Sequence, residues 1–380
     1  MHHTEMLNGQ FYEDTITNRL TTNYQQIHAM SHKILRHPSA IACWYRGGFP
    51  NPICTEIHPT NECDNMCVYC HYKNLHPKKD HKTKALVSEA NTLSSLQLES
   101  IIDQLATNNC QAVIFSGGGE PLMNPNTIEA VKRAKSNDMN VGFITNGQLI
   151  DREIAHQLIV LCTWIRVSLS ATTKENFIKV RGIDKFDDAL NGINELCLAK
   201  FLKHSNVTLG VQWIYTRLEP FEQLDRFIQQ WLSKRPIDYL QIIVEQSYNA
   251  AQLLRQANLK QAVSILQNKY KGVVNIISSK VDDLTKENFG RNYTECHGQA
   301  FVPMIAADNK IYLCCHLLGE EKALIGDLNE QSFEEVWYSQ KRQNIARNIN
   351  IEECMPLCKH HEINKFLHAI KQPMQHQNFL

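Results

Sequence analysis

Short apolar runs alternate with amphipathic stretches from about residue 53 to residue 270. The apolar runs predict six strands, at 53–57, 112–115, 141–144, 164–169, 207–214 and 239–244. The stretches between and after them predict helices at 96–105 and 128–134, from Asp151, from Thr172, and at 186–198, 221–232 and 250–270. This alternation is typical of a parallel sheet covered by helices. We therefore expect an α/β fold, a partial (β/α)6 TIM-like barrel with its chemistry on loops at the carboxyl ends of the strands.

The two ends of the chain lack this alternation. Residues 1–50 are mostly polar, with one predicted helix at about 22–35 and a Gly- and Pro-rich linker from Gly47. Beyond about residue 282, cysteines and short apolar runs replace the repeat. We expect three parts: an N-terminal helical and linker segment at 1–50, the barrel at 51–285, and a small C-terminal domain with its tail at 286–380.

Composition and charge narrow the class of protein. The chain has 380 residues, of which 43% are hydrophobic, enough for a full-sized core. Its 39 basic residues balance 39 acidic ones, so no charge excess indicates a nucleic-acid or membrane partner. No signal peptide or membrane span is evident, which predicts a soluble, cytoplasmic protein. In that compartment, 13 cysteines are expected to be metal ligands or buried thiols rather than disulfides.

Three cysteines follow the first predicted strand in the spacing C-x3-C-x2-C: Cys63, Cys67 and Cys70. Three thiolates on one short loop can hold three irons of a [4Fe–4S] cube and leave the fourth iron open to a small molecule. The alternative is a zinc site completed by His71. Structural zinc sites are built from spaced Cys and His pairs, so a histidine directly beside the last cysteine fits that alternative poorly.

A second motif, Ser116-Gly-Gly-Gly-Glu-Pro121, directly follows the second predicted strand. Glycines at such a position let a ligand approach the backbone closely. Glu120 adds a negative charge suited to an ammonium group. A glycine-rich turn that binds nothing is the alternative when the motif is taken alone. Its position one strand after the cysteine triplet favours ligand binding.

Together the two motifs resemble the radical S-adenosylmethionine (radical SAM) superfamily. The resemblance implies that the triplet holds a SAM-binding [4Fe–4S] cluster and that the glycine motif, with Gly117, Gly118, Gly119 and Glu120, binds the amino group of SAM. It also implies SAM contacts from residues at or after the ends of later strands: Asn146, Ser168, Ser170, Arg181 and Val244. In that assignment Arg181 pairs with the SAM carboxylate, as a guanidinium suits, and Val244 packs against adenine. A solvent-exposed arginine and a plain core valine are the alternatives.

The C-terminal cysteines form a second set. Cys296, Cys314, Cys354 and Cys358, with a turn at 308–310 and Trp337 between them, resemble the auxiliary-cluster domain of the SPASM/twitch branch. The resemblance implies that these four cysteines occupy all corners of an auxiliary [4Fe–4S] cluster, as in the single-cluster twitch form. The last pair departs from the common pattern, with three intervening residues instead of two. A zinc site made from the same four cysteines is the alternative.

Cys315 is left over beside a proposed ligand. It is a spare ligand, an inert thiol, or a hydrogen-atom donor that quenches a substrate radical. The last of these would make it a catalytic residue.

The resemblance implies an enzyme that uses an electron from a flavodoxin- or ferredoxin-type partner to cleave SAM into a 5′-deoxyadenosyl radical, which abstracts a substrate hydrogen. One auxiliary cluster and no evident peptide-recognition module favour a small polar metabolite, such as a sugar- or nucleoside-type natural-product intermediate. Dehydrogenation, decarboxylation and epimerisation all remain open. The alternatives are a peptide- or protein-modifying maturase or epimerase, and a non-catalytic metal-stabilised protein. Polar residues expected near the barrel mouth are Tyr72, Gln212, Glu245 and His297.

Overall fold

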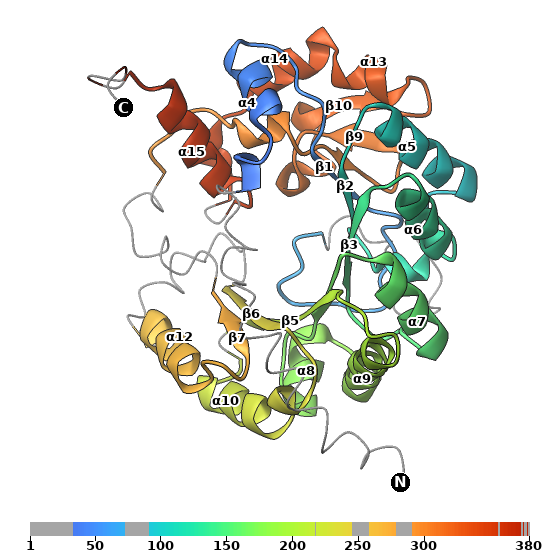
Figure 1. The fold of residues 1–380 in the computed structure, drawn as a ribbon, viewed down its shortest axis with the longest axis vertical. Helices are drawn as coiled ribbons and strands as arrows, with labels where there is room; N and C mark the ends of the chain where they lie inside the picture. The colour runs from blue at the N-terminus through green and yellow to red at the C-terminus, as the bar shows by residue number, and fades with distance from the viewer. Residues whose placement is uncertain are drawn as a thin grey trace, which may run out of the picture.

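A computed structural model describes residues 33–72, 91–216, 218–244, 258–278, 291–355 and 358–373, together with 375 and 378. Within these residues, ten strands form one sheet in the order β10-β9-β8-β1-β2-β3-β4-β5-β6-β7. Seven of them are parallel neighbours: β1 (Cys54–Ile57), β2 (Ala112–Phe115), β3 (Asn140–Thr145), β4 (Trp164–Ser168), β5 (Thr208–Tyr215), β6 (Tyr239–Val244) and β7 (Asn275–Ile277). The sheet curls, with helices on its outer side (Figure 1). The expected α/β partial barrel is therefore confirmed.

The helices of the barrel follow its strands. They are α5 (Ser95–Thr107), α6 (Thr127–Ser136), α7 (Arg152–Leu161), α8 (Lys174–Arg181), α9 (Phe186–Leu202), α10 (Phe221–Gln230) and α12 (Asn258–Lys269). Asp151 caps α7 as predicted, accepting a hydrogen bond from the backbone N–H of Ile154 at 2.8 Å. The cap of α8 is Thr173 rather than Thr172, because the Thr172 hydroxyl donates to the buried Glu219 carboxylate at 2.5 Å instead.

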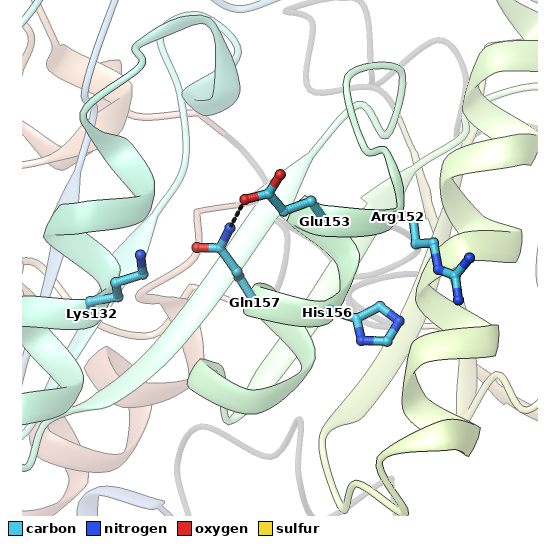
Figure 2. Close-up of a pocket in the computed structure, with 5 residues that line it drawn as sticks. All are labelled: Lys132, Arg152, Glu153, His156 and Gln157. Carbon is cyan, nitrogen blue, oxygen red and sulfur yellow. Dashed lines mark hydrogen bonds between the residues drawn. The ribbon is translucent and has the colours of Figure 1, made fainter.

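The outer layer carries an open hollow of about 680 Å³ between α6 and α7 (Figure 2). It is lined by Lys132, Arg152, Glu153, His156 and Gln157. These side chains lie on the helix side of the sheet, whereas the chemistry of parallel barrels is placed at the carboxyl ends of the strands. We therefore assign this hollow no part in the reaction.

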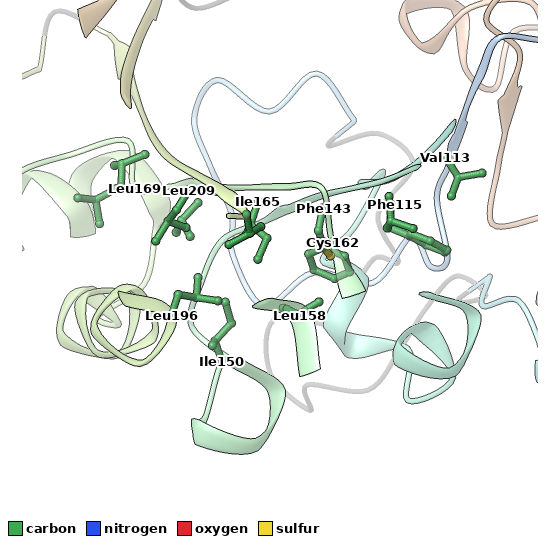
Figure 3. Close-up of a cluster of buried hydrophobic side chains, with 14 of the residues drawn as sticks. Val113, Phe115, Phe143, Ile150, Leu158, Cys162, Ile165, Leu169, Leu196 and Leu209 are labelled. Atoms are coloured by element: carbon green, nitrogen blue, oxygen red, sulfur yellow. The ribbon is translucent and has the colours of Figure 1, made fainter. Parts of the chain in front are cut away.

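The main hydrophobic core lies between the sheet and these helices (Figure 3). Alternate strand residues face it, because successive side chains of a strand point to opposite sides. On β4, for example, Ile165 and Val167 are fully buried in this core. Trp164, Arg166 and Ser168 therefore point to the opposite side, which we call the inner face of the sheet. The helices cover only the outer face, so polar residues can lie on the inner face.

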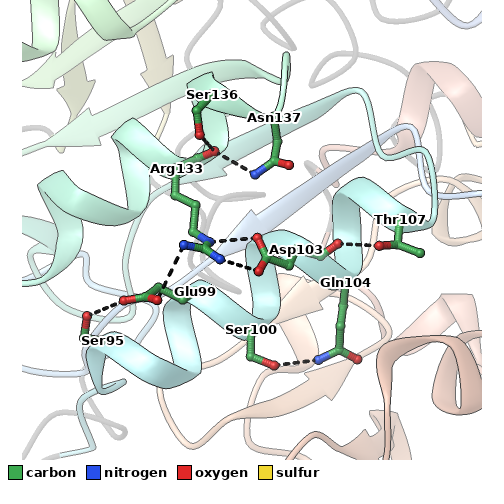
Figure 4. A network of polar contacts seen from close by, with 9 residues as sticks. All are labelled: Ser95, Glu99, Ser100, Asp103, Gln104, Thr107, Arg133, Ser136 and Asn137. Carbon is green, nitrogen blue, oxygen red and sulfur yellow. Dashed lines mark hydrogen bonds and ion pairs between the residues drawn. The ribbon is translucent and has the colours of Figure 1, made fainter.

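Polar contacts tie the outer helices together as well. Arg133 on α6 reaches back to α5, where its Nε and Nη2 donate to the two carboxylate oxygens of Asp103 at 2.7 and 2.5 Å (Figure 4). Glu99 lies 3.5 Å from the same guanidinium. The pair is bidentate but well exposed, so its contribution to stability is expected to be small.

Two aromatic rings cover the inner face near the amino ends of the strands. A Cβ added to Gly142 would lie 2.3 Å from the ring of Trp164, and one added to Gly210 would lie 2.0 Å from the ring of Tyr239. Glycines at these two positions therefore let each ring lie flat against the neighbouring strand. The inner face is closed by rings at this end and lined by polar side chains above them.

The C-terminal part continues the barrel sheet. Its strands are β8 (Met304–Ile305), β9 (Lys310–Tyr312) and β10 (Leu324–Asp327), and β8 runs parallel to β1 with Glu56 opposite Met304. β9 and β10 follow in antiparallel order. Short helices complete it: α13 (Phe333–Trp337), α14 (Gln340–Asn348) and α15 (His361–Lys371). Buried side chains from this part, Phe333 and Trp337 among them, join the main core.

At the N-terminal side the structure describes α4 (Pro38–Tyr45), which packs through Trp44 against Phe301. Most of the predicted helix at 22–35 lies outside the described residues, as does the first part of the helix predicted at 250–270. The predictions also omitted β7, a strand of only three residues. None of the described helices is long and apolar enough to cross a membrane.

Candidate iron–sulfur and cofactor site

Both sequence motifs lie at the carboxyl end of the sheet. The triplet of Cys63, Cys67 and Cys70 follows β1, and the glycine motif follows the adjacent β2. The predicted residues at the ends of β3 and β4 come next along the same edge, because these four strands are parallel neighbours. The fold therefore brings together motifs that are about 50 to 100 residues apart in the chain.

The cysteine loop is fixed by the C-terminal end of α8. The backbone N–H groups of Met66 and Val68 donate to the carbonyls of Arg181 and Val180, both at 2.9 Å. These carbonyls belong to the last turn of a helix, where no intrahelical donor is left for them. Gly182 ends α8 with φ +72°, and a Cβ there would lie 3.1 Å from Met66. The helix end thus determines where the three thiols lie.

The glycine motif holds the start of the same loop. Gly119 donates to the carbonyl of Thr60 at 3.0 Å, and Glu120 donates to that of Glu62 at 2.7 Å. A Cβ on Gly119 would lie 1.9 Å from the Glu62 oxygen, so only glycine fits there. Gly117 is equally constrained by the carbonyl of Gly119, at 1.6 Å. Two of the three glycines therefore serve close packing within the chain, while Gly118 has room for a side chain.

Glu120 is buried and lacks a cationic partner among the described residues. Its Oε1 accepts from the Thr145 hydroxyl at 2.7 Å, and its Oε2 accepts from the Asn146 backbone N–H at 2.7 Å. Burial raises the pKa of Glu120 to about 7, in spite of these hydrogen bonds. These two hydrogen bonds orient the carboxylate at the strand ends, where no cationic side chain among the described residues pairs with it.

Arg181 is buried against the cysteine loop. Its Nη1 donates to the Cys67 sulfur at 3.6 Å and its Nη2 to the Ser170 hydroxyl at 3.1 Å, while Nε has no hydrogen-bond partner in the described part of the chain. Burial opposes its charge, but the Tyr69 hydroxyl and the thiols of Cys67 and Cys63 raise its pKa overall. Arg181 is therefore not a solvent-exposed arginine; its cation lies beside the thiols.

Ser170 connects this arginine to the aromatic residue of the cysteine loop. Its hydroxyl lies 2.6 Å from that of Tyr69, and its backbone has φ +68°, a conformation that is uncommon for residues other than glycine. Such strain persists only where the surroundings impose it. Here the imposed contacts are those of Tyr69 and Arg181.

The other residues predicted to contact SAM differ in how far contacts within the chain already occupy their side chains. Asn146 donates from Nδ2 to Asp64 at 2.6 Å and accepts the Gln148 N–H at 2.9 Å, so both ends of its amide are used within the chain. Ser168 lies on the inner face, with its hydroxyl 3.5 Å from Gln212. The Val244 side chain is buried in the main hydrophobic core, as the alternative of a plain core valine predicts.

The four C-terminal cysteines are also brought together. A thiolate at Cys358 raises the pKa values of Cys296 and Cys314, and one at Cys354 also raises the pKa of Cys296. Burial, followed by the effect of Cys358, raises the pKa of Cys296 to about 12. Each of three sulfurs accepts an N–H group: Cys358 from His360 at 3.3 Å, Cys314 from His316 at 3.4 Å and Cys296 from Asn364 at 3.7 Å.

These features fit iron–sulfur clusters at both cysteine sets. N–H donors to cysteine sulfur, here from Arg181 and His360 among others, are a recognised means of tuning such clusters.

One buried polar cluster escaped the sequence predictions. Glu56 on the inner face of β1 accepts from the Ser116 hydroxyl at 2.6 Å, lies 3.2 Å from His58, and pairs with Lys359. Burial opposes the charge of Glu56, but Lys359 and His58 hold its pKa well below the usual range. Lys359 directly follows the proposed ligand Cys358. This pair therefore links the barrel to the C-terminal cysteines across 303 residues of sequence.

Cys315 lies beside this pair. Its thiol is buried and interacts with Lys359, Glu56 and the Tyr72 hydroxyl. Of the residues expected near the mouth, Tyr72 is thus placed next to Cys315, and Gln212 lies on the inner face of β5. His297 instead packs edge-on against Trp44, on the outside of the barrel. Glu245 lies outside the described residues.

Comparison with known families gives two matches. Residues 57–227 match the radical SAM superfamily, and residues 296–360 match the iron-sulfur cluster-binding SPASM domain. The matched segments contain the triplet and the glycine motif in the first case, and all four C-terminal cysteines in the second.

Curated relatives match part of the chain. The mycofactocin maturase MftC of Mycobacterium ulcerans (strain Agy99) is 32% identical over 158 residues, 41% of this chain and 40% of the relative. MftC of Mycobacterium tuberculosis (strain ATCC 25618 / H37Rv) is 31% identical over 184 residues, 48% of this chain and 42% of the relative. An Fe-coproporphyrin III synthase of Methanosarcina barkeri (strain Fusaro / DSM 804) is 34% identical over 137 residues, 36% and 31% respectively. The chain thus spans less than half the length of these relatives.

Solved structures share the fold at low identity. Streptococcus suis SuiB bound to S-adenosylmethionine has a TM-score of 0.60 and 18% identity, covering 84% of this chain and 74% of that one. SuiB bound to the precursor peptide SuiA gives 0.62 and 16%, covering 90% and 78%. Native anSMEcpe with bound AdoMet gives 0.56 and 17%, covering 81% and 88%. At these identities the likeness concerns the fold.

Proposed function

Because this chain belongs to the SPASM/twitch branch of the radical SAM superfamily, we propose that it is a peptide-modifying maturase. It is a radical SAM enzyme, with SAM and iron–sulfur clusters as its cofactors. When bound, a [4Fe–4S] cluster with one open iron would supply one-electron reduction of SAM, and through it hydrogen abstraction from the substrate. Cys63, Cys67 and Cys70 would hold that cluster. Cys296, Cys314, Cys354 and Cys358 would hold the auxiliary one.

The peptide substrate rests mainly on a shared fold. The shared fold with SuiB bound to a precursor peptide extends over 90% of this chain, through the barrel and the C-terminal domain. Two curated relatives are also named maturases. The small polar metabolite expected from the sequence has less support. That expectation depended on the lack of an evident peptide module, and it is the alternative in this proposal.

The chain's own residues orient SAM in this proposal. Glu120 would pair with the ammonium group of SAM, and Arg181 and Ser170 would bind its carboxylate; their hydrogen bonds to Thr145 and to each other support these roles. Asn146 acts through Asp64 and Gln148 to fix the strand end. The electron donor is a flavodoxin- or ferredoxin-type protein, in accordance with the chemistry of the superfamily.

The test compares two classes of substrate with anaerobically reconstituted, reduced protein. Peptides of random sequence form one pool; sugars, nucleosides and sugar alcohols form the other. We expect SAM to be cleaved to 5′-deoxyadenosine and the peptide pool alone to increase the rate. Stimulation by the metabolite pool alone would reject the peptide assignment. No 5′-deoxyadenosine at all, with both clusters intact, would support the non-catalytic alternative.

The pKa of Glu120 gives a first prediction. SAM binding should weaken roughly eightfold between pH 7.5 and pH 6, because an ammonium group pairs with the ionised carboxylate and the pKa of Glu120 is about 7 in the free protein. The sign follows from the raised pKa: at pH 6 the group is mostly protonated and must lose its proton before pairing. Equilibrium dialysis with labelled SAM measures the effect. Glu120→Gln should bind SAM more weakly and without this pH dependence; an unchanged pH profile in that variant would assign the dependence to another group.

A second prediction concerns Cys315 as a hydrogen donor. If its S–H bond breaks to form a C–H bond in the product, reactions in D2O should place one deuterium from the exchangeable thiol in the modified peptide. Cys315→Ala should still cleave SAM but lose that deuterated product. The buried thiol beside Tyr72 and Lys359 is placed for such a role. Mass spectrometry of the product decides: the same deuterium content in wild type and variant would make Cys315 an inert thiol.

A further inference from the structure

Among the described residues, the inner face of the sheet carries a half-buried arginine, Arg166, with an unsatisfied N–H group. Arg166 projects from β4, one inward position below Ser168 and therefore about 7 Å deeper along the strand. Its Nη1 donates to the Gln241 side chain at 2.9 Å. Its Nε is buried and has no hydrogen-bond partner among the described residues. No carboxylate in the described part of the chain forms an ion pair with it.

Two fully buried arginines elsewhere can be compared with Arg166, and the Nε of each also lacks a hydrogen-bond partner among the described residues. Arg181 has the thiols of Cys67 and Cys63 and the hydroxyl of Tyr69 around it. Arg342 stacks on the Trp337 ring at 3.5 Å and donates to the Trp337 carbonyl at 3.0 Å. Arg166 lies 5.9 Å from the Trp164 ring. A largely desolvated guanidinium with an unused N–H group is stabilised when a ligand supplies a negative charge.

A row of polar side chains lies beside Arg166 on the inner face. Gln241 accepts from both Arg166 and the Gln212 side chain, each at 2.9 Å. Gln212 in turn lies 3.5 Å from Ser168, which leads up to the strand-end site. The Tyr239 hydroxyl and the Glu56 carboxylate both favour the charge of Arg166, but Glu56 is also paired with Lys359, and burial lowers the pKa of Arg166 overall.

We propose that Arg166 binds a carboxylate of the substrate, held on the inner face beneath the strand-end site. This inference rests on the proposed peptide substrate and narrows it to peptides that present a carboxylate there. The carboxylate comes either from an Asp or Glu side chain or from the peptide C-terminus. A planar guanidinium with free N–H groups suits either source, because it can donate two parallel hydrogen bonds to one carboxylate.

The test measures which peptides the full-length, reconstituted protein retains with SAM present. Four random-sequence pools are used: with and without Asp and Glu, each with a free or an amidated C-terminus. Mass spectrometry of the retained peptides should show an enrichment of roughly tenfold or more for peptides that carry a carboxylate. Enrichment that follows the acidic side chains, or the free C-terminus, identifies the source.

Variants make the assignment specific. Arg166→Gln should abolish the enrichment, Arg166→Lys should keep part of it, and Arg342→Gln, which removes a buried guanidinium outside the inner face, should keep all of it. Circular dichroism checks that each variant is folded. Peptides retained by the wild type regardless of carboxylate content would overturn this inference and leave the peptide substrate standing. If no pool is retained and none stimulates SAM cleavage, the peptide substrate fails and the inference with it.

Discussion

Replacing Cys67 with serine is expected to abolish 5′-deoxyadenosine formation and to lower the iron content from about eight to about four per chain. The Cys67 sulfur is one of three thiols on the loop that α8 positions, and it receives a hydrogen bond from Arg181. A cube that loses one of its three protein ligands is not retained. The measurements are iron content after anaerobic reconstitution and the yield of 5′-deoxyadenosine. Cys43→Ser, at a half-buried cysteine within α4, is the matched control and should behave like the wild type.

Normal SAM cleavage by the Cys67→Ser protein would mean that the triplet does not hold the reacting cluster. Full iron content with loss of cleavage would instead indicate that serine replaces the thiolate as a ligand.

The second large effect is expected at Cys358, whose spacing from Cys354 departs from the common pattern. Cys358→Ala should lower the iron content from about eight to about four while SAM cleavage continues, and it should stop modification of the peptide. It should also lower the Tm, since metal binding and folding are coupled. The reason is structural: Cys358 is buried, interacts with Cys296 and Cys314, and receives the His360 N–H. Iron analysis and thermal unfolding measure the two effects.

Cys315→Ala serves as the matched control for this prediction, because Cys315 is the neighbouring cysteine that is left without a place in either set of ligands. It should retain about eight irons. If Cys315→Ala loses iron and Cys358→Ala does not, the ligand assignment must be exchanged between these two cysteines.

The features predicted correctly from the sequence, such as strands and one helix cap, are those set by the local pattern of residues. The strands at 112–115 and 239–244 were predicted to the residue, because buried parallel strands are continuous apolar runs. The Asp151 cap was also confirmed. The Thr172 cap was wrong by one residue, because Glu219, 47 residues later, binds the Thr172 hydroxyl. Tertiary contacts of this kind leave no mark on the local sequence.

The motif residues could likewise be placed by their spacing, but their neighbours could not. No pattern connects Glu56 with Lys359, or Arg166 with Gln241, since each pair meets only when separate strands and loops come together. The glycine motif illustrates the same limit. Its glycines were expected to admit a ligand, and in the structure Gly117 and Gly119 allow the chain to pack against itself.

The pairing of β1 with β8 has a consequence for how the protein is made. β1 lies in the interior of the sheet, with β2 on one side and β8 on the other. During synthesis β2 follows after some 60 residues, whereas Met304 of β8 emerges about 250 residues after its partner Glu56. Until then the nascent barrel presents β1 as an unpaired edge, a known starting point for aggregation. The triplet is synthesised before the C-terminal domain and can receive its cluster first. The four C-terminal cysteines can receive theirs only after β8 has been made and has paired with β1.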